Sequence, residues 1–450
     1  MGSNVIKRLL FNAFSMNCVS HIHHGLWARQ DTRQLEYCSL EPWIELAKIL
    51  ENGCFDALFL ADVLRTYDVF GGNADAAVKE AMQIPANDPK LLIPAMARET
   101  ENLGFAFTGS IYAEYPFNFA RTVSTLDHLS SGRIAWNIVT SYLPNAARNL
   151  GYERLPLHDK RYDRADEYME VLYKLWEGSW EEGAVLKDTE KGIYADPKKV
   201  HPINHKGTYY EVAGPHLCEP SPQRTPVLFQ AGSSERGREF AARHSECVFV
   251  STRNPRKYAH DLKRRVSHYG RKADDIRVFL ALSLVTGGTE EEARLKARAL
   301  EETLSIEGGL IHASGTSGVD LASIDLDKPI SDYDFNHVLG FYKDLADREQ
   351  DKTLTFRDIA RSQASGQWLI GSDEQVADKI EEFSKQGVDG FNLLYTTSPG
   401  TFVDFIEGVA PILKRRGLMQ DSYSEGSLRR KIFGESRLPS QHEGAAFRRR

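Results

Sequence analysis

The fold is decided by the stretch Phe55-Asp56-Ala57-Leu58-Phe59-Leu60-Ala61-Asp62, a short apolar run that ends in a carboxylate. A strand that is buried on both faces of a parallel sheet shows such a near-continuous apolar run. In α/β barrels, the polar residue that closes a buried strand lies at the face where the chemistry occurs. The stretch therefore predicts a strand over 55–61 and makes Asp62 a candidate site residue. A carboxylate that caps a helix or lies in a loop is the alternative interpretation.

Similar apolar runs occur on both sides of this stretch. They predict strands at Leu9–Ser15, Gly104–Ile111, Ile134–Thr140, Val227–Gln230, Cys247–Ser251, Ile276–Thr286 and Gly390–Tyr395. The amphipathic stretches between them predict helices at about 42–51, 119–129, 159–177, 255–269, 290–303, 373–386 and 402–416, and one that begins after 237. Strands that alternate with helices in this way are typical of α/β proteins, and they predict a (β/α)8 TIM barrel with insertions.

The length of 450 residues fits one barrel domain over 1–450, because barrels with insertions reach this size. We predict insertions at about 64–103, 178–225 and 304–367, and a C-terminal extension over 418–450. The 178–225 segment is rich in Gly, Pro and charged residues and predicts a hairpin with a short strand over 207–213. The 304–367 segment begins with a Gly-rich stretch over 307–318. It predicts a lid over the active face, with a structureless surface loop as the alternative.

Charge and composition exclude several classes of function. A net charge of −7 argues against a nucleic-acid partner, which would need a concentrated basic face. No run of 18 apolar residues and no signal-peptide pattern occurs, so neither a membrane partner nor export is expected. Five scattered cysteines without CxxC spacing predict neither disulfides nor a zinc site, and a cytoplasmic location fits them best.

Motifs for a nicotinamide domain, a P-loop, a nucleophile elbow and a zinc protease are all missing, so a redox enzyme of this sequence would receive its electrons from elsewhere. The stretch 231–237, Ala-Gly-Ser-Ser-Glu-Arg-Gly, opens a predicted helix and could hold a phosphate; plain N-capping is the alternative. Asn137 lies inside a predicted strand and needs a polar partner, either a ligand or backbone.

The cluster His21-Ile22-His23-His24 could suggest a metal, but no carboxylate or cysteine spacing completes a ligand set, so no metal is predicted. Hydrogen bonds from these histidines to substrate or backbone are the preferred interpretation. His21 is attractive because imidazole can donate or accept a proton near neutral pH. Cys18, just before it, is more often a buried filler than a nucleophile.

Several separate motifs resemble the luciferase-like flavin monooxygenases, in the branch with long-chain alkane, dimethyl sulfide, dibenzothiophene sulfone and nitrilotriacetate monooxygenases. They are Phe11 to Cys18, Phe55 to Val63, Ser124 to Leu129, Trp136 to Ser141, Glu219 to Pro226, Gln230 to Gly232 and Gly387 to Leu393. The resemblance implies an enzyme that uses reduced FMN from a separate NAD(P)H:flavin reductase, together with O₂. It implies a small apolar substrate, either a long-chain alkane or an organosulfur compound such as a dialkyl sulfide or sulfone. It also implies a homodimer or homotetramer.

The resemblance also implies roles for individual residues. FMN would be held by Asp62, Thr108, Asn137, Ser141, Tyr162, Ser233 and Ser234, with Tyr162 and the two serine amides on the phosphate. The catalytic candidates are His21, Cys18 and His312, and the pocket candidates are Tyr67, Gln83 and Tyr142. His21 is the first candidate for the hydrogen bond to the activated oxygen. Tyr142 replaces a histidine of the alkane enzymes, which favours an organosulfur substrate.

The family often has a non-prolyl cis peptide, which here would fall around Gly109-Ser110. Two other functions stay open on the same barrel. One is a deazaflavin-dependent oxidoreductase that transfers hydride without O₂. The other is a non-catalytic protein that binds flavin.

Overall fold

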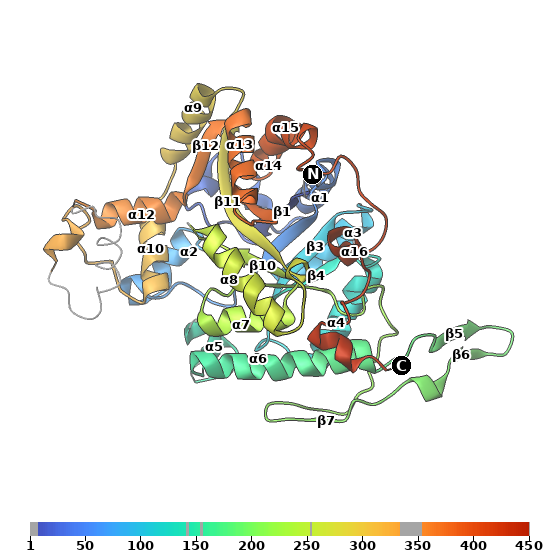
Figure 1. Ribbon diagram of the computed structural model, residues 1–450. Coiled ribbons are helices and arrows are strands. Elements are labelled where there is room, and N and C mark those ends of the chain that lie inside the picture. Colours follow the sequence, from blue (N-terminus) through green and yellow to red (C-terminus); the bar gives the residue numbers. More distant parts are fainter. Residues whose placement is uncertain (1–7, 141–143, 154–155, 253, 334–352, 450) are drawn as a thin grey trace.

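Parallel strands close into a barrel in the computed structural model, which describes residues 8–140, 144–153, 156–252, 254–333 and 353–449 (Figure 1). The barrel strands are β1 (Leu10–Met16), β2 (Ala57–Ala61), β3 (Gly104–Ser110), β4 (Ile134–Val139), β9 (Val227–Gln230), β10 (Cys247–Val250), β11 (Arg277–Gly287) and β13 (Gly390–Leu394). Each is paired in parallel with the next, and the pairing of β13 with β1 completes the circle. The (β/α)8 prediction is confirmed, and each barrel strand overlaps one predicted from the sequence.

Side chains alternate along each strand between the inside of the barrel and the helices around it, as the period of two requires. The inner cluster includes Leu10, Phe14, Phe59, Ala106, Ala135, Phe229 and Phe279. The outer cluster packs the strands against α1 (Glu41–Asn52), α3 (Ile93–Arg98), α4 (Pro116–Leu129), α6 (His158–Tyr173), α7 (Glu235–His244), α8 (Pro255–His268), α13 (Asp373–Ser384), α14 (Gly400–Asp404) and α15 (Ala410–Arg415). The inner cluster therefore forms the floor on which a site at the strand ends must rest.

The insertion over 178–225 forms two antiparallel hairpins, β5 (Val185–Asp188) with β6 (Ile193–Ala195), and β7 (His205–Lys206) with β8 (Glu211–Val212). The β5–β6 hairpin projects from the body of the molecule (Figure 1). The predicted strand over 207–213 is wrong for most of its length. The Glu167 carboxylate accepts hydrogen bonds from the backbone N–H groups of Thr208, Tyr209 and Tyr210, which holds them as the turn of the second hairpin.

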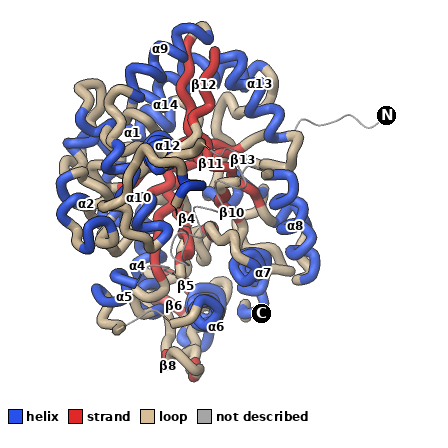
Figure 2. The backbone as a smooth tube through the Cα atoms, turned by 90° about the vertical axis from the view of Figure 1, so that its left-hand side faces the viewer, coloured by secondary structure: helices blue, strands red, loops and turns tan. Residues whose placement is uncertain are grey.

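The Gly-rich segment over 307–318 is not a loop but a helix, α10 (Ile306–Ser317). It packs on α12 (Phe356–Ser365) and near α2 (Asp75–Lys79), and the three helices stand together on one side of the barrel (Figures 1 and 2). A Cβ at Gly309 would lie 2.0 Å from the Ala360 carbonyl oxygen. The glycines thus lower the helix propensity but permit close helix packing. Residues 334–352 of the predicted lid lie outside the described residues.

One short strand and two helices flank the barrel in addition to the elements above. The short strand β12 (Trp368–Ser372) was not predicted, and it pairs with the end of β11 beyond the closed barrel. Helix α9 (Glu290–Glu301) contacts both of these strands. Helix α5 (Pro144–Asn149) follows β4.

The amino end of the barrel is covered by α16 (Leu428–Phe433) from the C-terminal extension. Leu428 and Ile432 join the inner cluster beside residues that begin strands, such as Leu10 and Val227. The next side chain, Arg429, is fully buried and forms an ion pair with Glu246. Helix α16 therefore covers the amino end of the barrel, which leaves the carboxyl ends of the strands as the place for a ligand site among the described residues.

Cis peptide bonds in the described ranges precede Pro85, Pro215 and Pro399. The cis bond predicted around Gly109-Ser110 is therefore wrong. Both residues keep the regular register of the sheet, opposite Ile138 and Val139. No helix in the described parts of the chain is long and apolar enough to cross a membrane.

Candidate active site

Polar side chains face the barrel interior where β3 and β4 end. The amide nitrogen of Asn137 donates to the Thr108 hydroxyl at 3.0 Å, and the sheet register places the two residues side by side. The Asn137 Oδ1 is buried and has no hydrogen-bond partner in the described chain. A buried acceptor without a partner costs about 1 to 3 kcal/mol, so the site is suited to a ligand that donates to it.

An anion cradle follows β9, where the chain leads into α7. Ser234 caps this helix by accepting from the Gly237 N–H at 3.0 Å, and its hydroxyl lies 3.2 Å from the His158 Nε2. The Tyr162 hydroxyl lies so close that a Cβ at Gly237 would be 2.8 Å from it. Ser233 is exposed beside Ser234. Free N–H groups, a hydroxyl and an imidazole thus converge at one helix start, which fits a phosphate.

Gln230, the last residue of β9, connects the cradle with the sheet. Its amide nitrogen lies 3.5 Å from the Tyr162 hydroxyl, while its Oε1 is buried without a partner in the described chain. Gln230 stands opposite Ile138 in the register, one residue beyond Asn137. Phe229 belongs to the inner cluster, so Gln230 faces the surrounding helices beside Tyr162, whereas the Asn137 acceptor faces the barrel interior. The cradle and the Asn137 acceptor both lie at the carboxyl end of the barrel, as a ligand with N–H groups and a phosphate requires.

Asp62 follows β2 directly, at the same end of the barrel. Burial, with a smaller contribution from the nearby Asp88, raises the pKa of its carboxyl group to about 6, against the lowering effects of the Val63 N–H and Lys90. The group therefore changes charge near neutral pH.

We expect the Asp62→Asn variant to be more stable than the wild type at pH 8, by about 1 to 2 kcal/mol. The folded protein holds the Asp62 proton more tightly than the unfolded chain does, so Asp62 destabilises the fold as pH rises from about 4 through 6. The difference in the free energy of unfolding should shrink toward zero as the pH falls to about 4. Denaturant titrations of both proteins across this range test the prediction, and a constant difference at every pH would contradict it.

His21 lies against the aromatic floor of the mouth. Its ring stacks on Phe14 at 5.1 Å between centroids, and Phe14 in turn contacts Phe59 at 5.2 Å and Phe249 at 5.3 Å. Burial lowers the pKa of His21 to about 3, with smaller contributions from His312 and His23. The Gln83 amide donates to the His21 backbone carbonyl at 3.2 Å and fixes the loop. His21 is therefore a neutral imidazole near neutral pH.

A large cavity of about 1190 Å³ opens beside this floor. Phe14, Phe249 and Leu394 line its inner end, and α12 lines it farther out with residues such as Ile359. His312 of α10 lines the same cavity. The inner end is aromatic and aliphatic, whereas many of the residues farther out are polar or charged, such as Lys379 and Glu382. The inner end therefore suits an apolar ligand.

Tyr67 and His312 are in contact next to this cavity. Their ring centroids lie 5.8 Å apart in an edge-to-face arrangement, and the Arg65 guanidinium lies over the Tyr67 ring at 3.9 Å. Burial, with a smaller contribution from the Arg65 charge, lowers the pKa of His312 to about 4. The structure thus brings His312, Tyr67, His21 and Gln83 to one side of the mouth.

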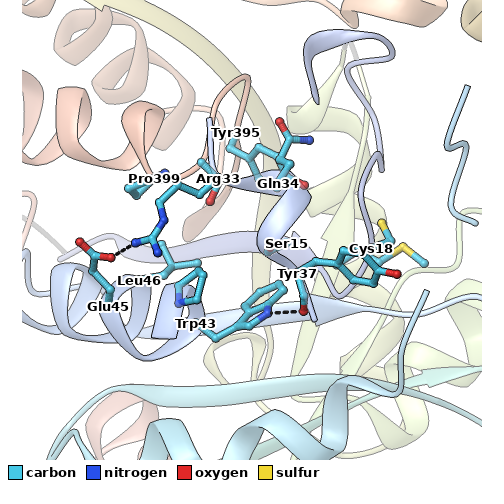
Figure 3. Close-up of a pocket in the computed structure, with 13 residues that line it drawn as sticks. Ser15, Cys18, Arg33, Gln34, Tyr37, Trp43, Glu45, Leu46, Tyr395 and Pro399 are labelled. Atoms are coloured by element: carbon cyan, nitrogen blue, oxygen red, sulfur yellow. Dashed lines mark hydrogen bonds and ion pairs between the residues drawn. The ribbon is translucent and has the colours of Figure 1, made fainter. Parts of the chain in front are cut away.

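Cys18 occupies a different place, a small pocket of about 30 Å³ between the end of β1 and α1 (Figure 3). Ser15, Gln34 and Tyr395 line it with Cys18, and an ion pair between Arg33 and Glu45 lies at its edge. The Cys18 thiol donates to the Ser20 carbonyl at 3.4 Å, and burial raises its pKa. A thiol held in its protonated form fits a lining role better than a nucleophilic one.

Ser141 and Tyr142 lie outside the described residues, so their predicted roles stay predictions. Sequence reasoning gave no site role to His158 or His24. His158 stands at the start of α6, a position where side chains often meet a neighbouring site. His24 contacts His312, which lies 288 positions away in the chain, and no local sequence pattern predicts such a contact.

Comparisons with known proteins agree with this geometry. A family profile described as luciferase-like monooxygenase matches residues 16–390. The chain is 48% identical to the long-chain alkane monooxygenase of Geobacillus thermodenitrificans over 98% of both chains. It is 45% identical to the dimethyl-sulfide monooxygenase of Hyphomicrobium sulfonivorans over 98% of this chain and 94% of the relative.

Solved structures give the same result. The crystal structure of DmoA from Hyphomicrobium sulfonivorans superimposes with a TM-score of 0.93, covering 98% of this chain and 96% of that one. A riboflavin lyase structure with modified FMN and riboflavin has a TM-score of 0.89 and 35% identity. The match covers 99% of this chain and 100% of that one.

Proposed function

Because the chain belongs to the luciferase-like monooxygenase family and is itself a monooxygenase, we propose that it inserts one atom of O₂ into a small, mostly apolar substrate with the help of reduced FMN. One observation supports this most directly: the anion cradle follows the end of β9, and residues at the ends of β10 and β13 line the 1190 Å³ cavity, so both lie at the carboxyl end of the barrel. A flavin phosphate and an apolar substrate can therefore be held at one barrel mouth. The relatives' names favour oxygen transfer over hydride transfer or flavin storage.

The residues present fit FMN. Its phosphate would be bound by the Tyr162 hydroxyl and the N–H groups at Ser233 and Ser234, and a ring N–H would satisfy the unpaired Asn137 Oδ1. Asp62 and Thr108 lie at the neighbouring strand ends, where the ring would extend. Bound in reduced form, the flavin would supply the electrons that activate O₂.

The protein's own task is to orient these partners and to exclude water. His21, held neutral by burial, would offer a hydrogen bond to oxygen without adding a charge. The packed rings of Phe14, Phe59 and Phe249 would exclude water from this part of the mouth. Exclusion of water matters because a reactive oxygen species that meets water is wasted as H₂O₂.

The substrate class follows from the cavity wall and from the relatives. The apolar inner end of the cavity, lined by Phe14, Phe249 and Leu394, suits a long-chain alkane or an organosulfur compound, and the two relatives described above are named for substrates of these kinds. Reduced FMN would come from a separate NAD(P)H:flavin reductase, since motifs for a nicotinamide domain are missing. We further propose that each chain is a single domain and that the chains form a homodimer or homotetramer in the cytoplasm. The free state of all five cysteines supports the cytoplasmic location.

Turnover with a substrate panel tests the function. The enzyme is supplied with FMN, NADH, a generic flavin reductase and air, together with an alkane, a dialkyl sulfide or a sulfone. We expect an oxygenated product from at least one class, in proportion to the NADH consumed above the rate without substrate. Full recovery of reducing equivalents as H₂O₂ with every substrate would contradict the proposal, and turnover without O₂ would favour the hydride-transfer alternative.

Binding of two flavins tests the phosphate cradle. Replacing Tyr162 with Phe removes one hydroxyl and should weaken FMN binding about tenfold, because hydrogen bonds to charged groups contribute about 1.5 to 3 kcal/mol. Riboflavin has the same ring but no phosphate, so its affinity should not change. Fluorescence titration of both ligands gives the comparison. Equal weakening of FMN and riboflavin would show that Tyr162 does not contact the phosphate.

A further inference from the structure

The backbone of His24 is hydrogen-bonded on both sides to residues of the 304–367 segment. Its backbone N–H donates to the Ala364 carbonyl at 3.1 Å, and its carbonyl accepts from the Ser305 N–H at 2.9 Å. A Cβ at Gly308 would come within 2.7 Å of the His24 Cβ, so α10 lies directly against this residue. Contacts on both sides therefore fix the direction of the His24 ring.

The His24 ring is hydrogen-bonded to His312. Its Nε2 lies 3.0 Å from the His312 Nδ1, and the two rings meet edge to face. Burial lowers the pKa of both residues, to about 4 for His312 and well below the usual value for His24. Both are therefore neutral near pH 7, and each has a single ring proton. Exactly one of the two rings can be the donor in this bond.

The environment of His24 decides which ring donates. Its other ring nitrogen, Nδ1, is buried and has no partner among the described residues. If His24 accepted through Nε2, its proton would be on Nδ1 and the protein would bury an N–H group without an acceptor. Buried orphan N–H groups are rarer than unpaired acceptors. His24 therefore keeps its proton on Nε2 and donates it to His312.

The consequence falls on His312. With Nδ1 occupied as an acceptor, the single proton of His312 must be on Nε2, and this nitrogen has no hydrogen-bond partner in the described chain. His312 lines the 1190 Å³ cavity. We propose that His24 is a positioning residue that holds His312 as the Nε2–H tautomer, so that His312 offers a hydrogen-bond donor rather than an acceptor at the cavity. Use of that donor by an oxygen atom in the cavity rests on the proposed function, whereas the tautomer itself does not.

His23 provides an internal reference. The Trp368 indole N–H, which can only donate, lies 3.3 Å from the His23 Nδ1, and the Ser283 hydroxyl lies 3.3 Å from the His23 Nε2. His23 is therefore also an Nε2–H tautomer, fixed by a partner independent of His24. Its spectrum shows what a locked ring of this kind looks like in the same protein.

The experiment is NMR of the ring nitrogens in the full chain labelled with ¹⁵N-histidine, with His312→Gln and His23→Gln variants to assign the signals. We expect His24, His23 and His312 of the wild type to be Nε2–H tautomers. His24→Gln keeps a donor group and should leave His312 unchanged. His24→Met has similar bulk without a donor, and it should shift the ratio of His312 tautomers by roughly fivefold toward Nδ1–H, as the loss of one hydrogen bond implies.

Two results would overturn the proposal: a wild-type His312 with its proton on Nδ1, or a His24→Met protein in which His312 keeps the wild-type ratio. If the Met variant does not fold, the wild-type and Gln spectra still decide the question. In turnover assays, the amount of product formed per NADH consumed should be lower in His24→Met than in the wild type. In His24→Gln it should equal the wild-type value. If the proposed function is wrong, the amount of product per NADH tests nothing, whereas the NMR spectra alone still test the tautomer assignment.

Discussion

Alanine in place of His21 is expected to lower the rate of product formation about 100-fold while NADH consumption continues, so that most reducing equivalents appear as H₂O₂. His21 is neutral and stacked on the aromatic floor, where a hydrogen bond to oxygen is not weakened by water. Removal of a single hydrogen-bond donor to a developing charge in such a site costs about 100-fold to 1000-fold in rate. Product and H₂O₂ are measured together per NADH consumed.

The matched control is alanine in place of His260, an exposed histidine of α8 on the outside of the barrel. That variant should couple NADH to product as the wild type does. Thermal unfolding of both variants separates loss of the hydrogen bond from loss of the fold. Wild-type coupling in the His21→Ala enzyme would remove His21 from the mechanism.

Methionine in place of Arg429 is expected to destabilise the fold by about 3 to 5 kcal/mol, because it leaves the Glu246 carboxylate buried without its cation. The guanidinium contacts the two Glu246 oxygens at 2.7 and 2.8 Å, and it donates to the Thr225 and Pro226 carbonyls at 2.8 Å each. The side chains of both charged partners are almost completely buried. The midpoint of thermal unfolding should fall by at least about 5 °C.

Two controls make this prediction specific. Arg294→Ala breaks an exposed pair with Glu290 and should change stability by less than about 1 kcal/mol. The double variant Arg429→Met with Glu246→Gln removes the stranded charge and should recover part of the loss. A single variant as stable as the wild type would show that this ion pair contributes nothing to closing the amino end of the barrel.

The sequence predicts the barrel well because each strand is buried on both faces and therefore shows its own apolar run. It predicts the insertions poorly. The short β12 pairs only with the part of β11 beyond the barrel, and nothing in Trp368–Ser372 marks that partner. The sequence does not predict α10 because its glycines disfavour a helix locally, and the close approach of His24, Ala360 and Tyr67 explains them.

The same division applies to the site. Asp62, Asn137 and Ser234 can be predicted because strand ends and helix starts mark them in the sequence. The roles of His23 and His24 cannot, because their partners Trp368 and His312 lie 345 and 288 positions away in the chain, and the choice of tautomer depends on those partners. The sequence predicts Cys18 and His312 as catalytic candidates together, yet the two residues line different pockets.

The position of α16 beneath the barrel has a consequence for biosynthesis. Residues 428–433 leave the ribosome after every barrel strand has emerged, so until then the amino end of the nascent barrel is exposed to solvent. During that interval Leu10 and Val227 lack their cover, and Glu246 lacks its counter-ion. A stalled or truncated translation product that ends before Leu428 is thus a substrate for chaperones and proteases, although its catalytic half is fully synthesised.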